Sequence, residues 1–146
     1  MPAEHAELCF VDTNIWLYAF VENGHEPSAA TKGQIARALL REIKPVISTQ
    51  VVNEVCVNLL RQAHFTEEQI RQLIEAFYEK YPVVASTRAT LLIASSLRER
   101  YSLSYWDSTI VAAALEVGAR VLYSEDMQHG LRIEGRLEIR NPFVSN

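Results

Sequence analysis

The stretch LCFVDTNIWL, residues 8–17, decides the fold. Its first four residues are all apolar, which is typical of a strand that is buried on both faces. The polar residues 12–14 interrupt this run, and apolar residues resume at Ile15. The stretch therefore predicts a buried strand, a polar turn and a helix in direct succession.

Strand-like and helix-like segments alternate along the rest of the chain. Short apolar runs predict further strands, at residues 46–48, 81–84, 120–123 and around 137–139. Helices are predicted at residues 29–43, 49–60, 66–77, 87–100 and 104–118, where apolar residues recur at three- and four-residue spacings. Capping residues mark several of the starts, and Pro45 and Gly118 are stop signals. Because parallel strands need crossover connections, this alternation predicts one α/β domain over residues 1–146. We expect a three-layer α/β/α sandwich around a mostly parallel sheet of four or five strands.

The composition excludes several classes of protein. Of the 146 residues, 49% are hydrophobic and 22% are charged, which is ordinary for a soluble globular domain. The net charge of −4 argues against nucleic-acid binding through a broadly basic surface, so any such contact must be local.

No apolar run could span a bilayer, and the acidic start, residues 1–7, does not resemble a signal peptide, so we expect a cytoplasmic protein without a membrane partner. Cys9 and Cys56 lie in apolar runs without a CxxC spacing, which predicts buried thiols rather than a disulfide or a metal site.

Four acidic residues occupy corresponding places after the predicted strands. Asp12 directly follows the first strand, and Asp126 lies just past the strand 120–123. Glu54 falls in the second turn of its helix and Asp107 in the first turn of another. Ligand sites in parallel sheets form outside the carboxyl ends of the strands, so the four carboxylates are expected at one rim. Each acid alone could be a helix cap, a turn residue or a solvated position, so the prediction depends on the set.

Carboxylates that converge repel one another unless a cation lies between them. Mg²⁺ and Mn²⁺ prefer oxygen ligands and are commonly held by carboxylates together with substrate phosphates. Zinc is a poor match, because the sequence has no clustered histidines and no suitable cysteine pair. Such ions promote phosphodiester hydrolysis. Asn14 and Ser124 stand beside acids of the set, and we expect them to orient a carboxylate or a metal-bound water.

The acids and their neighbours resemble the PIN-domain ribonucleases, in particular the toxin nucleases of bacterial VapC type. The resemblance covers nearly the whole chain and rests on FVDTN at 10–14, STQVVNE at 48–54, YWDSTIVAAA at 105–114 and LYSEDMQHG at 122–130. It implies a Mg²⁺- or Mn²⁺-dependent endoribonuclease that cleaves RNA. It places the family's acidic positions at Asp12, Glu54, Asp107 and Asp126 and its accompanying polar positions at Asn14 and Ser124. It also implies a homodimer and, for toxin members, a cognate antitoxin.

Some alternatives stay open. Glu125 adjoins the fourth acid and could replace it, although Asp126 is favoured because the family pattern has a hydroxyl residue two positions earlier, as Ser124 is here. His129 is expected in a loop rather than as a general base, and Trp106 is expected to pack rather than to stack on bases.

The competing functions are weaker. A phosphatase of haloacid-dehalogenase type would need an aspartate where Asn14 stands, and a receiver domain would need a tandem acidic pair near the first strand. A catalytically silent PIN-like module that binds RNA or protein would be expected to lose one or more acids, and this chain keeps all four.

Overall fold

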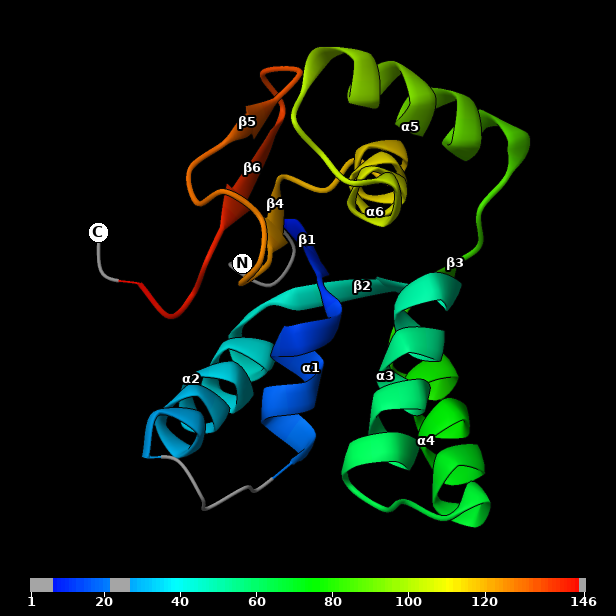
Figure 1. The fold of residues 1–146 in the computed structure, drawn as a ribbon, viewed down its shortest axis with the longest axis vertical. Helices are drawn as coiled ribbons and strands as arrows, with labels where there is room; N and C mark the ends of the chain where they lie inside the picture. The colour runs from blue at the N-terminus through cyan, green and yellow to red at the C-terminus, as the bar shows by residue number, and fades with distance from the viewer. Residues whose placement is uncertain (1–6, 22–26, 145–146) are drawn as a thin grey trace.

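The computed structural model describes residues 7–21 and 27–144. Residues 1–6, which form most of the acidic start, lie outside these ranges. Strands and helices follow one another in the order β1-α1-α2-β2-α3-α4-β3-α5-α6-β4-β5-β6 (Figure 1). The predicted alternation is therefore present over the described part of the chain.

The described strands form one sheet in the order β3-β2-β1-β4-β6-β5. They are β1 (Leu8–Val11), β2 (Lys44–Ser48), β3 (Val83–Val84), β4 (Val121–Tyr123), β5 (Arg132–Ile133) and β6 (Leu137–Arg140). Neighbouring strands run parallel, except that β5 is antiparallel to β6. In the middle of the sheet, Phe10 of β1 is in register with Val46 of β2 and Leu122 of β4.

Helices cover both faces of this sheet. They are α1 (Thr13–Phe20), α2 (Pro27–Glu42), α3 (Thr49–Gln62), α4 (Glu67–Lys80), α5 (Arg88–Arg100) and α6 (Tyr105–Glu116). Figure 1 shows α1 to α4 on one side of the strands and α5 and α6 on the other. Helix α1 packs on α2 and α3, α3 on α4, and α5 on α6. The predicted three-layer α/β/α sandwich is confirmed, and no described helix is long and apolar enough to cross a membrane.

The sheet has six strands rather than the predicted four or five, and the additional one is β5. It pairs with β6 through a hairpin whose turn residues, Glu134 and Gly135, have φ angles of 54° and 66°. Three residues, 134–136, connect the two strands, and the Arg136 N–H donates to the Ile133 carbonyl at 3.0 Å and closes the turn. A strand of two residues is too short to show an alternating pattern, so periodicity could not reveal it.

Two predicted boundaries also shift. Only Val83 and Val84 of the predicted strand 81–84 pair with β2, because Tyr81 ends α4 as its C-cap. Helix α2 ends at Glu42, and Pro45 belongs to β2, where it lies in register with Cys9.

The core lies between the sheet and its helices. Phe10 and Val11 are fully buried, as expected for a central strand, and most of α6 is buried as well. Trp16 is 1% exposed, its indole N–H donates to the Val11 carbonyl at 3.1 Å, and its ring makes an edge contact with Phe77 of α4. Both cysteines are buried and unbridged, as predicted.

Two of the helices begin where a strand leaves the sheet. Asp12 is the N-cap of α1 directly after β1, and Ser48, the last residue of β2, is the N-cap of α3. The first turns of α1 and α3 are thereby fixed relative to the carboxyl ends of β1 and β2. Helix α6 follows α5 instead, with Ser104 as its N-cap, and Gly118, with φ of 74°, follows its C-cap.

Thr66 and Gln69 form the predicted capping box at the start of α4. We expect Thr66→Ala to lower the free energy of unfolding by about 1 kcal/mol, because the Gln69 N–H loses its acceptor. Equilibrium urea denaturation measures this change. Thr66→Ser keeps the hydroxyl and is expected to unfold like the wild type, and equal losses in both variants would contradict the role of the cap.

Candidate active site

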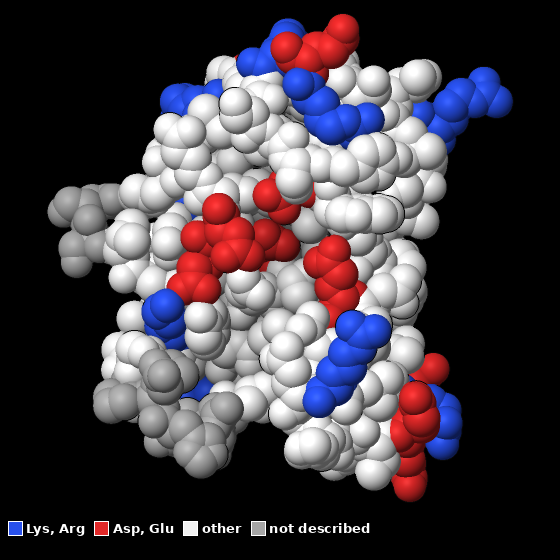
Figure 2. Space-filling view, in the orientation of Figure 1, with Lys and Arg blue, Asp and Glu red and all other residues white. Residues whose placement is uncertain are grey.

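The four predicted acids come together at the carboxyl rim of the sheet. Figure 2 shows Asp and Glu side chains gathered near the middle of one face of the molecule. Thr13 bonds to both Asp12 and Glu54, and the next residue, Asn14, bonds to Asp126. Burial is the largest cause of the raised pKa of Asp12 and of Asp107, and the negative charges of neighbouring acids of the set add to it.

Asp12 is the most buried acid of the set, with 6% of its surface exposed. Its Oδ1 accepts a hydrogen bond from the Thr13 N–H at 2.8 Å, and its Oδ2 accepts one from the Ser124 hydroxyl at 2.9 Å. Burial raises the pKa of Asp12 to about 6, the two neighbouring carboxylates add to this effect, and the two hydrogen bonds oppose it. Ser124 can reach Asp12 because Val11 and Tyr123, which precede them, are in register on adjacent strands.

Glu54 is held by two groups that the sequence did not single out. The Thr13 hydroxyl donates to its Oε2 at 2.6 Å, and the Gln50 amide donates to its Oε1 at 3.2 Å. Gln50 in turn accepts a hydrogen bond at 2.6 Å from the hydroxyl of Thr109 in α6. Thr13 directly follows Asp12, and Gln50 lies one helical turn before Glu54. These two sequence positions are the signals that could have identified Thr13 and Gln50.

Asp107 lies in the first turn of α6 and is partly buried. Its N–H donates to the Ser104 hydroxyl at 3.1 Å, which is the predicted N-cap interaction. Burial is the largest cause of its raised pKa, and a hydrogen bond from Ser104 acts in the opposite direction.

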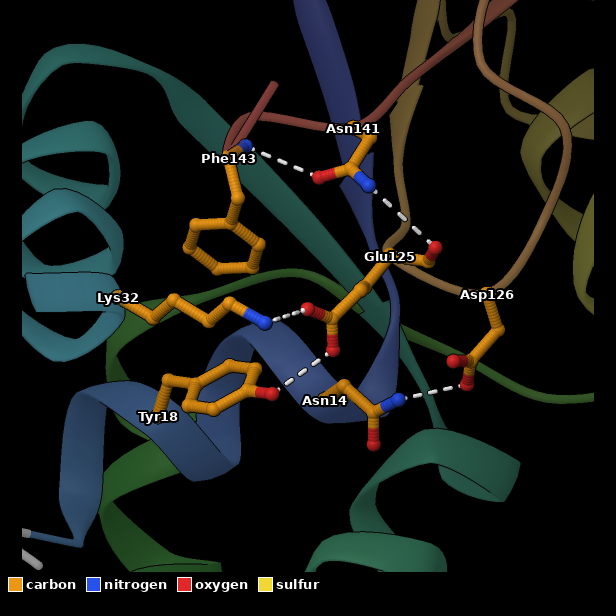
Figure 3. Close-up of polar contacts among 7 residues, drawn as sticks. All are labelled: Asn14, Tyr18, Lys32, Glu125, Asp126, Asn141 and Phe143. Carbon is orange, nitrogen blue, oxygen red and sulfur yellow. Dashed lines mark hydrogen bonds and ion pairs between the residues drawn. The ribbon is translucent and has the colours of Figure 1, made fainter. Parts of the chain in front are cut away.

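Asp126 and Glu125 point in different directions (Figure 3). The Asn14 amide donates to Asp126 Oδ2 at 2.6 Å. Glu125 instead accepts a hydrogen bond from the Tyr18 hydroxyl at 2.8 Å and forms an ion pair of 2.5 Å with Lys32. Of the two acids, Asp126 is the one that interacts with Asp107 and whose carboxylate is bonded by Asn14.

The Lys32–Glu125 pair belongs to a cluster that joins α1, α2 and the C-terminal segment. The Lys32 ammonium lies 5.3 Å from the centre of the Tyr18 ring and 5.5 Å from that of Phe143, within the range of cation–π attraction. The Asn141 amide donates to the Glu125 carbonyl at 3.4 Å (Figure 3). These contacts anchor the loop after β4, which carries Asp126.

The prediction for Trp106 is wrong. Its side chain is 63% exposed, because it occupies the first turn of α6 ahead of the buried residues, which begin at Ser108. His129, in contrast, is in a loop as expected, where its Nδ1 accepts the Asn141 N–H at 2.9 Å.

The side chains of the acidic rim offer oxygen ligands, which suit a hard divalent cation. Within residues 7–21 and 27–144, no three His, Cys, Asp or Glu side chains form a ready-made metal cluster. Side chains of Thr13, Asn14 and Ser124 each donate a hydrogen bond to one of the carboxylates. The donor set is composed of oxygen atoms, which suits an ion such as Mg²⁺ that keeps several waters and takes few protein ligands, and does not suit a closed zinc site.

Comparison with known families identifies one match. The family model described as PIN domain matches residues 9–130, which include all four acids. No curated protein matches the chain significantly.

Several solved structures share the fold at 19% sequence identity. A toxin–antitoxin complex from Klebsiella pneumoniae has a TM-score of 0.69, covering 92% of this chain and 97% of the other. The sarcin–ricin-loop-cleaving toxin VapC20 from Mycobacterium tuberculosis has a TM-score of 0.64, covering 81% and 89%. VapBC2 from Rickettsia felis, bound to a DNA fragment from its promoter, has a TM-score of 0.60, covering 92% and 99%.

The raised pKa of Asp12 predicts how stability depends on pH without divalent ions. Folding raises this pKa from its ordinary value of 3.8 to about 6, so the folded state binds the proton more tightly than the unfolded state. The free energy of unfolding should therefore fall as pH rises from about 4 to about 6. We expect Asp12→Asn, which cannot ionise, to lack this component and to exceed the wild type at pH 7 by up to roughly 3 kcal/mol.

Urea denaturation of both proteins in EDTA at a series of pH values measures this difference. The gap between the variant and the wild type should close as pH falls below about 4, where the wild-type carboxyl is protonated in both states. A gap that stays constant over this range would show that Asp12 ionises without a penalty from burial.

Proposed function

The chain belongs to the PIN-domain family, and we propose that it is a divalent-metal-dependent endoribonuclease that hydrolyses RNA phosphodiester bonds as the toxin of a toxin–antitoxin pair. The observation that carries this proposal is the convergence of the four acids on one rim. The adjacent residues Thr13 and Asn14 bond to three of them, and Gln50 links Glu54 to the residue that precedes Asp107. Such a rim is unfavourable by itself, because burial and mutual repulsion disfavour ionised carboxylates. The raised pKa of Asp12 and of Asp107 reflects this cost. A bound cation would remove that cost.

We assign the cation as Mg²⁺ or Mn²⁺ and its ligands as carboxylates of Asp12, Glu54, Asp107 and Asp126. When bound, such an ion would supply the means to activate a water and to stabilise the charge that develops on the phosphoryl and leaving oxygens. The all-oxygen character of the rim supports this choice. Glu125 is not among the proposed ligands, because Lys32 already neutralises its carboxylate.

The hydrogen bonds of the site give the protein's own residues distinct tasks. Ser124 and the Thr13 N–H stabilise the ionised form of Asp12 and fix the plane of its carboxylate. The Thr13 hydroxyl orients Glu54, and Asn14 orients Asp126. These groups hold the acids in place before the substrate arrives, so little reorganisation is needed during the reaction.

The proposed partners are RNA, a cognate antitoxin and a second copy of the chain. The similarity to toxins in complex with antitoxins supports the antitoxin. We expect the antitoxin to place a segment in or across the acidic rim. The similarity to a sarcin–ricin-loop-cleaving toxin makes an RNA loop the first substrate to test. The proposed setting is the cytoplasm, where such RNA is exposed.

The central test is cleavage of an end-labelled RNA loop by the purified protein in Mn²⁺ or Mg²⁺. We expect Asp12→Asn and Asp107→Asn each to lower the cleavage rate on the order of 100-fold or more, because each removes a charge that balances the cation. Glu75→Gln, an exposed acid on α4 outside the rim, should cleave like the wild type. Unchanged cleavage in both aspartate variants would reject the assigned site. If no divalent ion supports cleavage of any RNA, the chain is instead a PIN-like binding module.

A second test separates Asp126 from Glu125 without an activity measurement. An ion that binds only the folded protein raises its melting temperature by mass action, so titration with Mn²⁺ should stabilise the wild type. We expect Asp126→Asn to reduce this rise and Glu125→Gln to preserve it, because the Glu125 carboxylate is already paired with Lys32. The opposite pattern would transfer the fourth position to Glu125.

A further inference from the structure

A groove of about 610 Å³ opens directly beside the acidic rim. It is lined by Gln50, Asn53 and Glu54 of α3, Leu91 of α5, and Tyr105 and Trp106 of α6, among others. Two features join it to the acids: Glu54 is part of its wall, and Trp106 directly precedes Asp107. An RNA strand whose phosphate reached the rim would therefore have a neighbouring nucleotide within reach of the groove.

We propose that this groove binds one unstacked base of the RNA substrate, with Trp106 as the stacking surface. The proposal rests on the proposed ribonuclease function and adds a binding contact next to the cleaved bond. It assigns Trp106 to substrate binding and not to the chemical step.

The walls of the groove present aromatic and aliphatic surface to solvent. Trp106 is 63% exposed, and about half of Tyr105 and of Leu91 is exposed. The two aromatic rings lie edge to face with their centres 5.1 Å apart, which restrains both in orientation. Exposed aromatic rings beside a nuclease site are suitable platforms for bases, because every base has a flat apolar face.

The polar side chains of α3 complement the edge of a base. Gln50 is immobilised by its bonds to Glu54, to Thr109 and to the Trp106 carbonyl, so it braces the start of α6 against α3. Asn53 lies three residues further along the same helix and is exposed. Its amide offers both donors and an acceptor, as recognition of the edge of an unpaired base requires.

One cation strengthens this side of the site. The Arg98 guanidinium stacks over the Tyr105 ring at 4.4 Å, and its Nη1 donates to the Ser108 hydroxyl at 2.6 Å. This fixed positive charge is the kind of local contact that a chain with a net charge of −4 needs in order to approach a polyanion.

The competing occupant is a second copy of the chain. Exposed apolar side chains such as Val57 and Leu92 would suit such an interface. The groove itself contains a carboxylate and several amides, which a self-association surface would have to bury and to pair. A base with an apolar face and a polar edge matches this lining better.

Tryptophan fluorescence tests the proposal in EDTA, so that binding is separated from hydrolysis. The chain has two tryptophans, and Trp16 is 1% exposed, so quenching by RNA reports on Trp106. The probes are an oligouridine of about eight nucleotides and an abasic ribose–phosphate chain of equal length and charge. We expect saturable quenching by the oligouridine only. Anisotropy of an end-labelled oligouridine measures the Kd of variants that lack Trp106. Trp106→Phe should remove the quenching but retain most of the affinity, and Trp106→Ala should raise the Kd about 5- to 150-fold.

Tyr78→Ala is the matched control, because Tyr78 is an exposed aromatic residue of α4 outside the groove, and its Kd should equal that of the wild type. An equal Kd for Trp106→Ala and the wild type would overturn the proposal. A second pattern would also overturn it, because the groove would then be an interface between copies. In that pattern Trp106 emission changes with protein concentration alone, and light scattering shows that Trp106→Ala loses the dimer while its Kd for RNA is unchanged. RNA that binds through Trp106 but is never cleaved would reject only the ribonuclease function, and RNA that is cleaved without dependence on Trp106 would reject only this inference.

Discussion

The burial of a carboxylate at the end of the central strand is the constraint on which the rest of the structure depends. Asp12 is 6% exposed and lies near two other acids, so its charge is costly and its pKa rises to about 6. Two donors stabilise that charge, one from the start of α1 and one from Ser124 at the end of β4. The pairing of β1 with β4 must therefore keep its register, because a slip of one residue would turn Ser124 to the other face of the sheet.

The same constraint explains why polar side chains bond to the acids. Thr13 lies between Asp12 and Glu54, and Asn14 reaches across to Asp126. Each of these contacts stabilises an ionised carboxylate and limits its movement towards its neighbours. The Lys32–Glu125 pair performs a related task at the edge of the site, where it removes one more negative charge from the rim and anchors the loop that carries Asp126.

One turn of α6 links the proposed chemistry to the proposed binding of RNA. Consecutive residues of a helix point about 100° apart, so Asp107 can face the acids while Trp106 faces the adjacent groove. Gln50 connects the two functions, because it bonds both to Glu54 and to the Trp106 carbonyl. A shift of α6 relative to α3 would change the rim and the groove together.

Local sequence was sufficient for the alternation of strands and helices, for the capping residues and for the place of all four acids, because each depends on neighbours within a few positions. It was not sufficient to show how Asp126 and Glu125, which are adjacent and chemically alike, differ in their contacts. Asp126 bonds to Asn14, which is 112 residues away, and Glu125 bonds to Lys32, which is 93 residues away. The exposure of Trp106 likewise depends on how α6 packs in the assembled fold. The strand β5 is a different case, because it pairs with its sequence neighbour β6 but has only two residues. Contacts between distant segments leave no periodic signal in the sequence, so only the assembled sheet and its helices could reveal them.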